Sequence, residues 1–172
     1  MSDFKINLGA ITNGSNLFSF EIKDTFFEAY TFSEVRNADI TATALLEKNS
    51  KKLELNLSID GQIHKLLCDI CAEELSIDIS AETKVIIQKT NDDLISTDEI
   101  FYVKINENSI DLKQLIFELI VLNIPKKRQH TLNNKRNSIC NKEMINLVNK
   151  YTKKKENTSD DMWDALKDLN LK

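Results

Sequence analysis

The first two thirds of this 172-residue chain are dominated by apolar residues that recur at every second position. Residues 40–46 and 53–59 alternate in this way on either side of a polar stretch at 47–51, and residues 75–87 repeat the pattern over a longer run. Alternation places every second side chain on one face of a strand, so one face is buried while the other meets water. The pattern predicts an antiparallel β-meander, either as a sheet or as a partly open barrel.

Two dipeptides supply candidate hairpin turns, an Asn-Gly pair at 13–14 and an Asp-Gly pair at 60–61. Such pairs favour two-residue turns because Gly adopts positive φ readily. We expect a hairpin at 60–61 that sets Leu53 opposite Cys68. The cysteine pair that begins with Cys68 is then held at the open end of that hairpin.

The period of the apolar pattern changes from two to that of a helix after residue 109. Asp111 and Gln114 form a candidate capping box, and Pro125 is expected to stop the helix near Asn123. One apolar stripe marks the face of this helix that is expected to cover the sheet. The stripe consists of Leu112, Leu115, Ile116, Leu119 and Leu122.

The predicted fold class is therefore α+β, with a meander sheet or partly open barrel covered by one main helix. Composition divides the chain into a β-rich core domain with its covering helix at 1–125, a basic segment at 126–149, a polar linker at 150–158 and a short C-terminal helix at 159–172.

The net charge of −4 conceals an uneven distribution of charge. Residues 126–155 contain ten Lys or Arg and one acid, a charge of +9, whereas the rest of the chain carries −13. Such a split indicates either association of the two parts or an anionic partner for the basic one, and phosphate binding competes with a solvated tail as its interpretation. The candidate phosphate-binding residues are Lys126, Lys127, Arg128, Lys135 and Arg136.

Cys68 and Cys71 form a Cys-x-x-Cys pair, which places two sulfurs on one side of a bent backbone. A tetrahedral metal site needs two more ligands, and the candidates are His64, His130 and Cys140. Three cysteines in a chain without an export signal argue against a disulfide framework. Structural zinc, inert buried thiols and redox chemistry remain as alternatives, and the antiparallel pattern disfavours the redox use.

Other classes of protein are disfavoured by what the sequence lacks. No apolar run approaches the ~20 residues of a membrane span, and the first residues do not resemble an export signal, so we expect a cytoplasmic protein. Three glycines leave no phosphate-binding loop, and no nucleophile, base and acid occur in a recognisable order. We therefore expect no enzymatic activity and no small-molecule substrate.

Four short motifs, in their order and spacing, resemble the YceD family of large ribosomal RNA subunit accumulation proteins. They are Leu-Cys-Asp-Ile-Cys at 67–71, Ile-Asp-Leu at 110–112 after an acidic stretch, Glu-Leu-Ile-Val-Leu-Asn-Ile-Pro at 118–125 and Asp-Met-Trp-Asp-Ala-Leu-Lys at 161–167. The resemblance implies a cytoplasmic, non-enzymatic factor that supports accumulation of large-subunit ribosomal RNA, in contact with that RNA, an assembly intermediate or a ribosomal protein.

Many members of this family carry a second cysteine pair after the element that ends at Pro125. Here only Cys140 remains, with His130 as the substitute ligand, so the predicted zinc site is Cys68, Cys71, His130 and Cys140. His64 is expected on a strand surface instead.

The C-terminal segment has helical spacing of apolar residues after a cap at Ser159 or Asp160. A helix of about ten residues is marginal alone, so it must dock on its own domain or on a partner. Trp163 and Leu166 are the candidate partner anchors. An adaptor that recruits another protein through this helix and an acidic face is the alternative to an RNA-associated factor.

Overall fold

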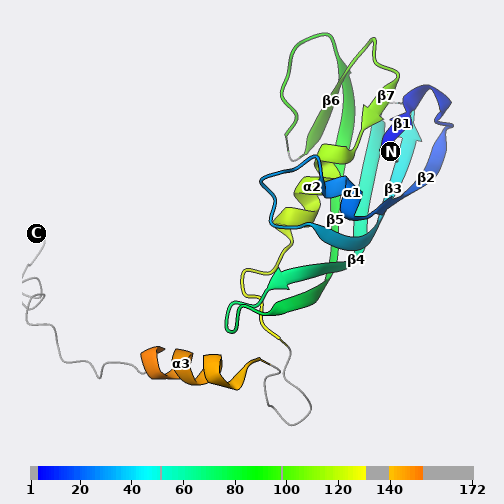
Figure 1. Ribbon diagram of the computed structural model, residues 1–172. Helices are drawn as coiled ribbons and strands as arrows, with labels where there is room; N and C mark the ends of the chain where they lie inside the picture. The colour runs from blue at the N-terminus through cyan, green and yellow to red at the C-terminus, as the bar shows by residue number, and fades with distance from the viewer. Residues whose placement is uncertain (1–3, 51, 98, 131–139, 153–172) are drawn as a thin grey trace, which may run out of the picture.

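The computed structural model describes residues 4–50, 52–97, 99–130 and 140–152. Its body is a five-stranded sheet in the order β2-β3-β4-β5-β6, accompanied by a two-stranded sheet of β1 and β7 (Figure 1). The elements in chain order are β1 (Lys5–Asn7), the 3-10 helix η1 (Leu8–Ala10), β2 (Gly14–Ile22), α1 (Asp24–Phe27), β3 (Asn37–Asn49), β4 (Lys52–Leu67), β5 (Glu74–Thr90), β6 (Ile100–Lys104), β7 (Ser109–Asp111), α2 (Lys113–Leu122) and α3 (Lys142–Thr152).

The pairs β2–β3, β3–β4 and β4–β5 are antiparallel, as the alternating pattern predicts. The mixed α+β fold is thus confirmed, with an open sheet and not a barrel. Strand β6 departs from the expected order because it runs parallel to β5, with Ile100 opposite Ile86. The connection at 91–99 carries the chain back along β5 before β6 begins.

One face of the large sheet is buried beneath α1, α2 and the small β1–β7 sheet (Figure 1). Burial of a Leu or Ile side chain contributes about 1.5–3 kcal/mol, so this layer supplies most of the apolar stabilisation. An aromatic contact joins the layer to the loop after α1, where the rings of Tyr30 and Phe117 stack with centroids 3.7 Å apart. The fully buried strand residues include Ile40, Leu46, Leu55, Leu57, Ile59 and Ile63.

Helix α2 ends as predicted, with Asn123 at its C-terminal cap two residues before Pro125. Its predicted capping box is wrong. The Asp111 carboxylate accepts a hydrogen bond from the Lys113 backbone at 2.9 Å, but the Gln114 side chain donates to Glu118 instead, at 2.8 Å.

The expected hairpin turns are wrong at both glycine dipeptides. The Asn-Gly pair at 13–14 leads into β2, but β1 pairs with β7 and not with β2. The Asp-Gly pair at 60–61 lies inside β4, where Gly61 is paired with Ile40 on one side and Ile79 on the other. Leu53 consequently lies opposite Ile87 and not opposite Cys68.

Position 61 requires glycine because the backbone of the neighbouring strand β3 lies too close to leave room for a side chain. A Cβ atom at this position would lie 2.2 Å from the Asp39 carbonyl oxygen and 2.7 Å from the Ile40 Cα, and φ is +153°. Both clashes are with backbone, so a side chain is accommodated only if β3 and β4 move apart.

We expect Gly61→Ala to lower the free energy of unfolding by about 1–3 kcal/mol or more, as overpacked interior sites do. Gly14→Ala is the matched control, because Gly14 also has positive φ (+97°) but has no other atom within 4 Å of the added Cβ. The control isolates backbone strain, which costs about 1 kcal/mol. Denaturant unfolding of both variants measures the difference, and equal losses would contradict the close-approach explanation.

Candidate metal centre and basic segment

Cys68 and Cys71 lie in the turn that joins β4 to β5. The turn is closed by hydrogen bonds from the Cys68 backbone N–H to the Glu73 carbonyl and from the Ala72 backbone N–H to the Cys68 carbonyl, both 2.9 Å long. Ala72 has φ of +56°, a conformation that reverses the chain. The cysteine pair therefore sits at the closed end of a hairpin, not at the open end that the sequence suggested.

A β-bulge upstream decides the direction in which Cys68 points. The pairing of β4 with β5 shifts between Ile63 and Leu66, and Lys65 within the bulge has φ of +57°. Before the bulge the odd-numbered residues of β4 are buried, whereas Leu66 and Cys68 are buried after it. A bulge inserts one residue, so it turns Cys68 from the solvent-facing side to the buried side.

The segment after Pro125 is fixed to the same turn by two backbone contacts. The Asp69 backbone N–H donates to the Arg128 carbonyl at 2.8 Å, and the Arg128 backbone N–H donates to the Asp69 carboxylate at 2.6 Å. His130 follows two residues later, and its Nε2 donates to the Glu74 carbonyl at 3.2 Å. Because Nε2 carries the proton, the lone pair of Nδ1 is directed at the cysteines.

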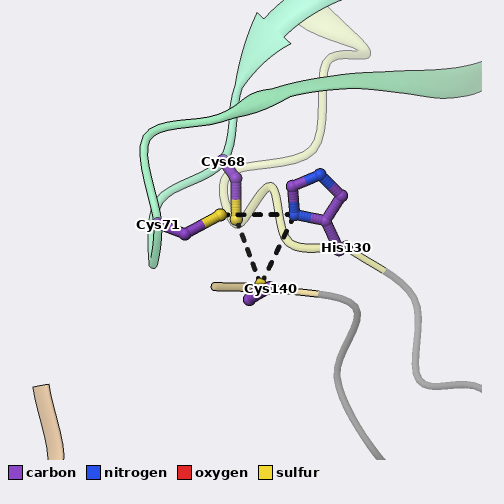
Figure 2. Close-up of side chains that lie close together, drawn as sticks. All are labelled: Cys68, Cys71, His130 and Cys140. Atoms are coloured by element: carbon purple, nitrogen blue, oxygen red, sulfur yellow. Dashed lines mark hydrogen bonds between the residues drawn. The ribbon is translucent and has the colours of Figure 1, made fainter. Parts of the chain in front are cut away.

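The four predicted ligands converge (Figure 2). Cys68 Sγ lies 3.6 Å from Cys140 Sγ, and His130 Nδ1 lies 3.5 Å from Cys71 Sγ and 3.4 Å from Cys140 Sγ. All four ligand atoms are within 4.8 Å of one another. Tetrahedral zinc with Zn–S bonds of about 2.3 Å sets sulfur atoms about 3.8 Å apart. The cluster thus has the composition and the size to hold a metal ion such as zinc.

The surroundings favour the thiolate form of Cys68, which is the form that binds metals. Burial raises the pKa of this thiol, but hydrogen bonds from the backbone N–H groups of Cys71, Ile70 and His130 lower it by more. The net result is a pKa of about 6. Burial likewise lowers the pKa of His130, and the Glu74 carbonyl and the Cys68 sulfur outweigh it, so the net change is upward. The three cysteines are buried and His130 is half-buried, which shields the group from bulk water.

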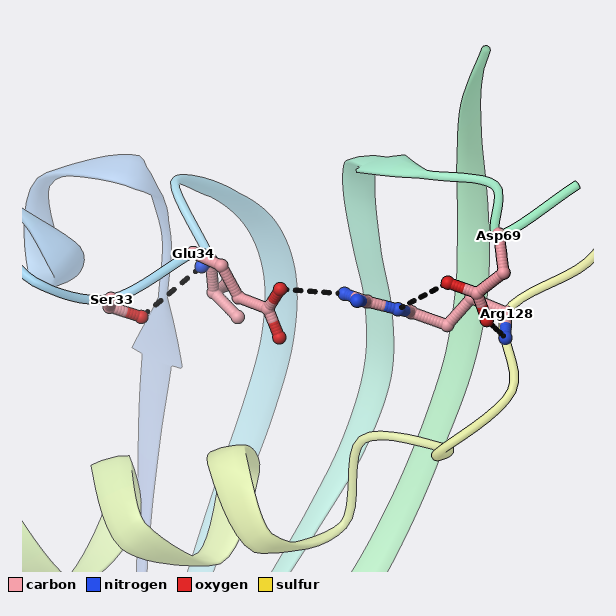
Figure 3. Close-up of polar contacts among 5 residues, drawn as sticks. Ser33, Glu34, Asp69 and Arg128 are labelled. Atoms are coloured by element: carbon pink, nitrogen blue, oxygen red, sulfur yellow. Dashed lines mark hydrogen bonds and ion pairs between the residues drawn. The ribbon is translucent and has the colours of Figure 1, made fainter. Parts of the chain in front are cut away.

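The Arg128 side chain is engaged by acidic residues of the body (Figure 3). Its guanidinium lies 2.8 Å from the Glu34 carboxylate and 4.0 Å from that of Asp69, and its side chain is only 21% exposed. The geometry gives Arg128 a positioning role, because it ties the loop before β3 to the cysteine turn. It also distinguishes Arg128 from Lys126 and Lys127, which are exposed.

The remaining predicted site residues are Lys135, Arg136, Trp163 and Leu166, which lie outside the described residues. Their roles, and the division of the chain into domains, stay predictions. His64 lies on the β4–β5 surface, where its Nδ1 is 2.9 Å from the Ser76 hydroxyl, and it is not part of the cluster.

Comparison with protein families adds one finding. The family model described as large ribosomal RNA subunit accumulation protein YceD matches residues 55–170, which is more than half of the chain. The chain belongs to the YceD family. This membership implies a role in the accumulation of large-subunit ribosomal RNA, and the family description names no catalytic activity. The matched range includes the cysteine turn, α2 and the whole basic segment.

No curated protein and no solved structure matches the chain. Among the described residues, no helix has the length and apolar character needed to cross a membrane.

We expect Arg128→Ala to lower the melting temperature, because it leaves Glu34 and Asp69 without their cation, whereas Lys127→Ala leaves it unchanged. Removal of a charged hydrogen-bond partner costs about 1.5–3 kcal/mol in protected sites and less at exposed ones, so we expect about 1 kcal/mol for this half-buried residue. Thermal unfolding of both variants measures this. The positioning role is refuted if Arg128→Ala has the same melting temperature as the wild-type protein.

Proposed function

We propose that this member of the YceD family supports accumulation of large-subunit ribosomal RNA by binding the RNA backbone through its basic segment, and that a structural zinc ion fixes this segment to the sheet. The proposal rests mainly on the convergence of His130 and Cys140 with the cysteine turn. These two ligands bracket residues 131–139 in sequence, which include Lys135 and Arg136. The metal centre would thus hold both ends of that stretch.

The charge of the segment supports RNA as the partner. Clustered Lys and Arg release counterions from phosphates and need no sequence-specific contact. Lys126 and Lys127 are exposed in the stretch that leads to His130, and Lys142 and Lys150 are exposed on α3. The −10 charge of residues 1–125 would repel RNA from the body and restrict binding to this segment.

Zinc would be held by Cys68, Cys71, His130 and Cys140, with the Glu74 carbonyl orienting the imidazole. Four protein ligands fill a tetrahedral shell and leave no position for a substrate, as in structural zinc sites. The ion would therefore link three separate stretches of chain: the β4–β5 turn, the segment after Pro125 and the start of α3. Such a link stabilises the folded state by the free energy of metal binding.

We expect the purified full-length protein to contain about one equivalent of zinc and to lose it in the Cys68→Ser and Cys140→Ser variants. Elemental analysis measures the zinc content, and cobalt substitution reports thiolate coordination through its absorption spectrum. A chelator should lower the melting temperature of the wild-type protein by several degrees. His64→Ala is the control and should retain the metal. A metal-free wild-type protein whose melting temperature responds to neither zinc nor chelator would overturn the zinc proposal.

For RNA binding, we expect replacement of Lys126, Lys127, Lys135 and Arg136 by Ser to weaken binding of large-subunit ribosomal RNA. The slope of log K against log salt should flatten by about 0.7 for each phosphate of single-stranded RNA that the variant no longer neutralises. Arg128 is kept, so that the fold is not disturbed. Filter binding or anisotropy over a salt series measures both quantities.

A matched pair of double variants controls for net charge. Lys126→Ser with Lys127→Ser should reduce RNA affinity, whereas Lys5→Ser with Lys89→Ser removes the same charge from exposed positions on the body and should have little effect. Equal effects of the two double variants would show that only net charge matters and would refute the proposed RNA-binding segment.

A further inference from the structure

The two edge strands of the large sheet, β6 and β2, differ in how well their backbone is protected from pairing with another strand. Strand β6, at one edge, has only five residues, and the chain before it covers part of its backbone. The Tyr102 N–H donates to the Ser96 hydroxyl at 3.0 Å, and the Ile100 carbonyl accepts from the Thr97 N–H at 2.8 Å. Short length and covered backbone are the usual ways in which proteins prevent an edge from pairing with another strand.

Strand β2, at the other edge, has none of these protections in the part of the chain that the structure describes. Its nine residues pair with β3 along their whole length. They include no proline, and Glu21 is their single charged residue. Antiparallel pairing directs the N–H and C=O of every second residue away from the partner strand. Outside the pairing with β3, no backbone hydrogen bond involves β2 among the described residues, and only the Gly14 carbonyl accepts a side-chain bond, from Asn16.

The side chains of β2 also leave apolar surface uncovered on both faces of the sheet. Leu17, which lies opposite Leu45, is 68% exposed. On the helix-covered face, Phe18 and Phe20 are only half-buried, although both pack against the core and the Phe20 ring lies 5.7 Å from that of Phe4. A strand added beside β2 would satisfy the free backbone groups and would cover these side chains on both faces.

We propose that β2 pairs antiparallel with β2 of a second copy of this chain, which joins two sheets into one continuous sheet of ten strands. A two-fold axis perpendicular to the sheet keeps the helix-covered faces of both copies on the same side. With the axis at Phe18, this residue meets its own copy, Leu17 lies opposite Ser19, and Asn16 lies opposite Phe20. Apolar side chains then remain on the faces where they already lie.

The low charge of β2 favours a second copy of this chain as its partner over a nucleic acid or a basic peptide. In this register Glu21 lies opposite Ser15, so no two like charges face each other across the pair. A nucleic acid would need cations, and β2 has none. A basic peptide would need an acidic edge, but Glu21 is already paired with Lys23 at 3.2 Å. An edge with one charged residue, which faces Ser15 of the second copy, can thus pair with itself without repulsion.

A strand pair is a small interface, so the dimer should dissociate on dilution. Sedimentation of the wild-type protein should show a monomer–dimer equilibrium that shifts to dimer as the concentration rises into the high micromolar range. Hydrogen exchange of the β2 amides should slow over the same range, whereas the β6 amides should not change. A wild-type protein that stays monomeric, with no change in exchange at β2, overturns the proposal.

A charge-swap experiment tests the register. The double substitution Leu17→Lys with Ser19→Lys places lysines opposite each other twice, and Leu17→Glu with Ser19→Glu does the same with acids. Each double variant should be monomeric, and an equimolar mixture of the two should form the dimer again. Dimerisation of both separate variants as strong as that of the wild type, or failure of two folded variants to associate when mixed, overturns the proposed register.

Thr41→Lys with Thr43→Lys is the matched control. These threonines lie on the same face of the sheet as Leu17 and Ser19, but on the interior strand β3. The control variant gains the same two positive charges, but on β3 these do not face the same charges of the second copy. It should therefore dimerise like the wild type. Circular dichroism of every variant confirms that the sheet is retained.

Discussion

The one-residue shift in pairing between Ile63 and Leu66 is the constraint on which the site depends. Strand β4 enters the bulge with its odd residues buried and leaves it with Leu66 and Cys68 buried. Without the extra residue, Cys68 would project from the open face of the sheet, away from the segment that carries His130. The positive φ of Lys65 is the local cost of this change, and the burial of Leu66 and Cys68 offsets it.

The segment after Pro125 is basic, yet its first turn is held by acidic residues of the body. Asp69 contacts both the backbone and the side chain of Arg128, and Glu34 engages the same guanidinium. The arrangement divides the positive charges into two groups. Arg128 is paired with two carboxylates and positions the segment against the cysteine turn, while Lys126 and Lys127 remain exposed. A charge count from the sequence treats all of them alike, although their surroundings make them physically different.

A feature of the structure could be predicted from the sequence where it leaves a pattern within a short stretch of the chain. Alternation predicted β3, β4 and β5, because it is produced by burial of one face along each strand. The ligand set was predicted because the chain has few residues that bind soft metals. Gly61 was misread because a glycine in a tight turn and a glycine beside a close backbone look the same in sequence. The Glu34–Arg128 contact joins residues 94 positions apart, so no local pattern could indicate it.

The residues matched by the family model bear on only one of the two proposals, RNA binding through a zinc-fixed basic segment, and not on dimerisation through β2. It begins at residue 55, inside β4, and so includes the cysteine turn, α2 and the basic segment, but not β2 or β3. Membership of the family therefore bears on the RNA-related role, and the matched range includes the four residues of the candidate metal centre. It says nothing about the exposed β2 edge. That edge lies across β3 and β4 from β5, the strand that follows the cysteine turn. Strand pairing at β2 does not involve the turn between β4 and β5 that carries Cys68 and Cys71, so a dimer would carry two such turns on one continuous sheet. Loss of the dimer would then halve the number of proposed RNA-binding segments per particle without changing either segment. The RNA-binding proposal and the dimer proposal can therefore fail independently.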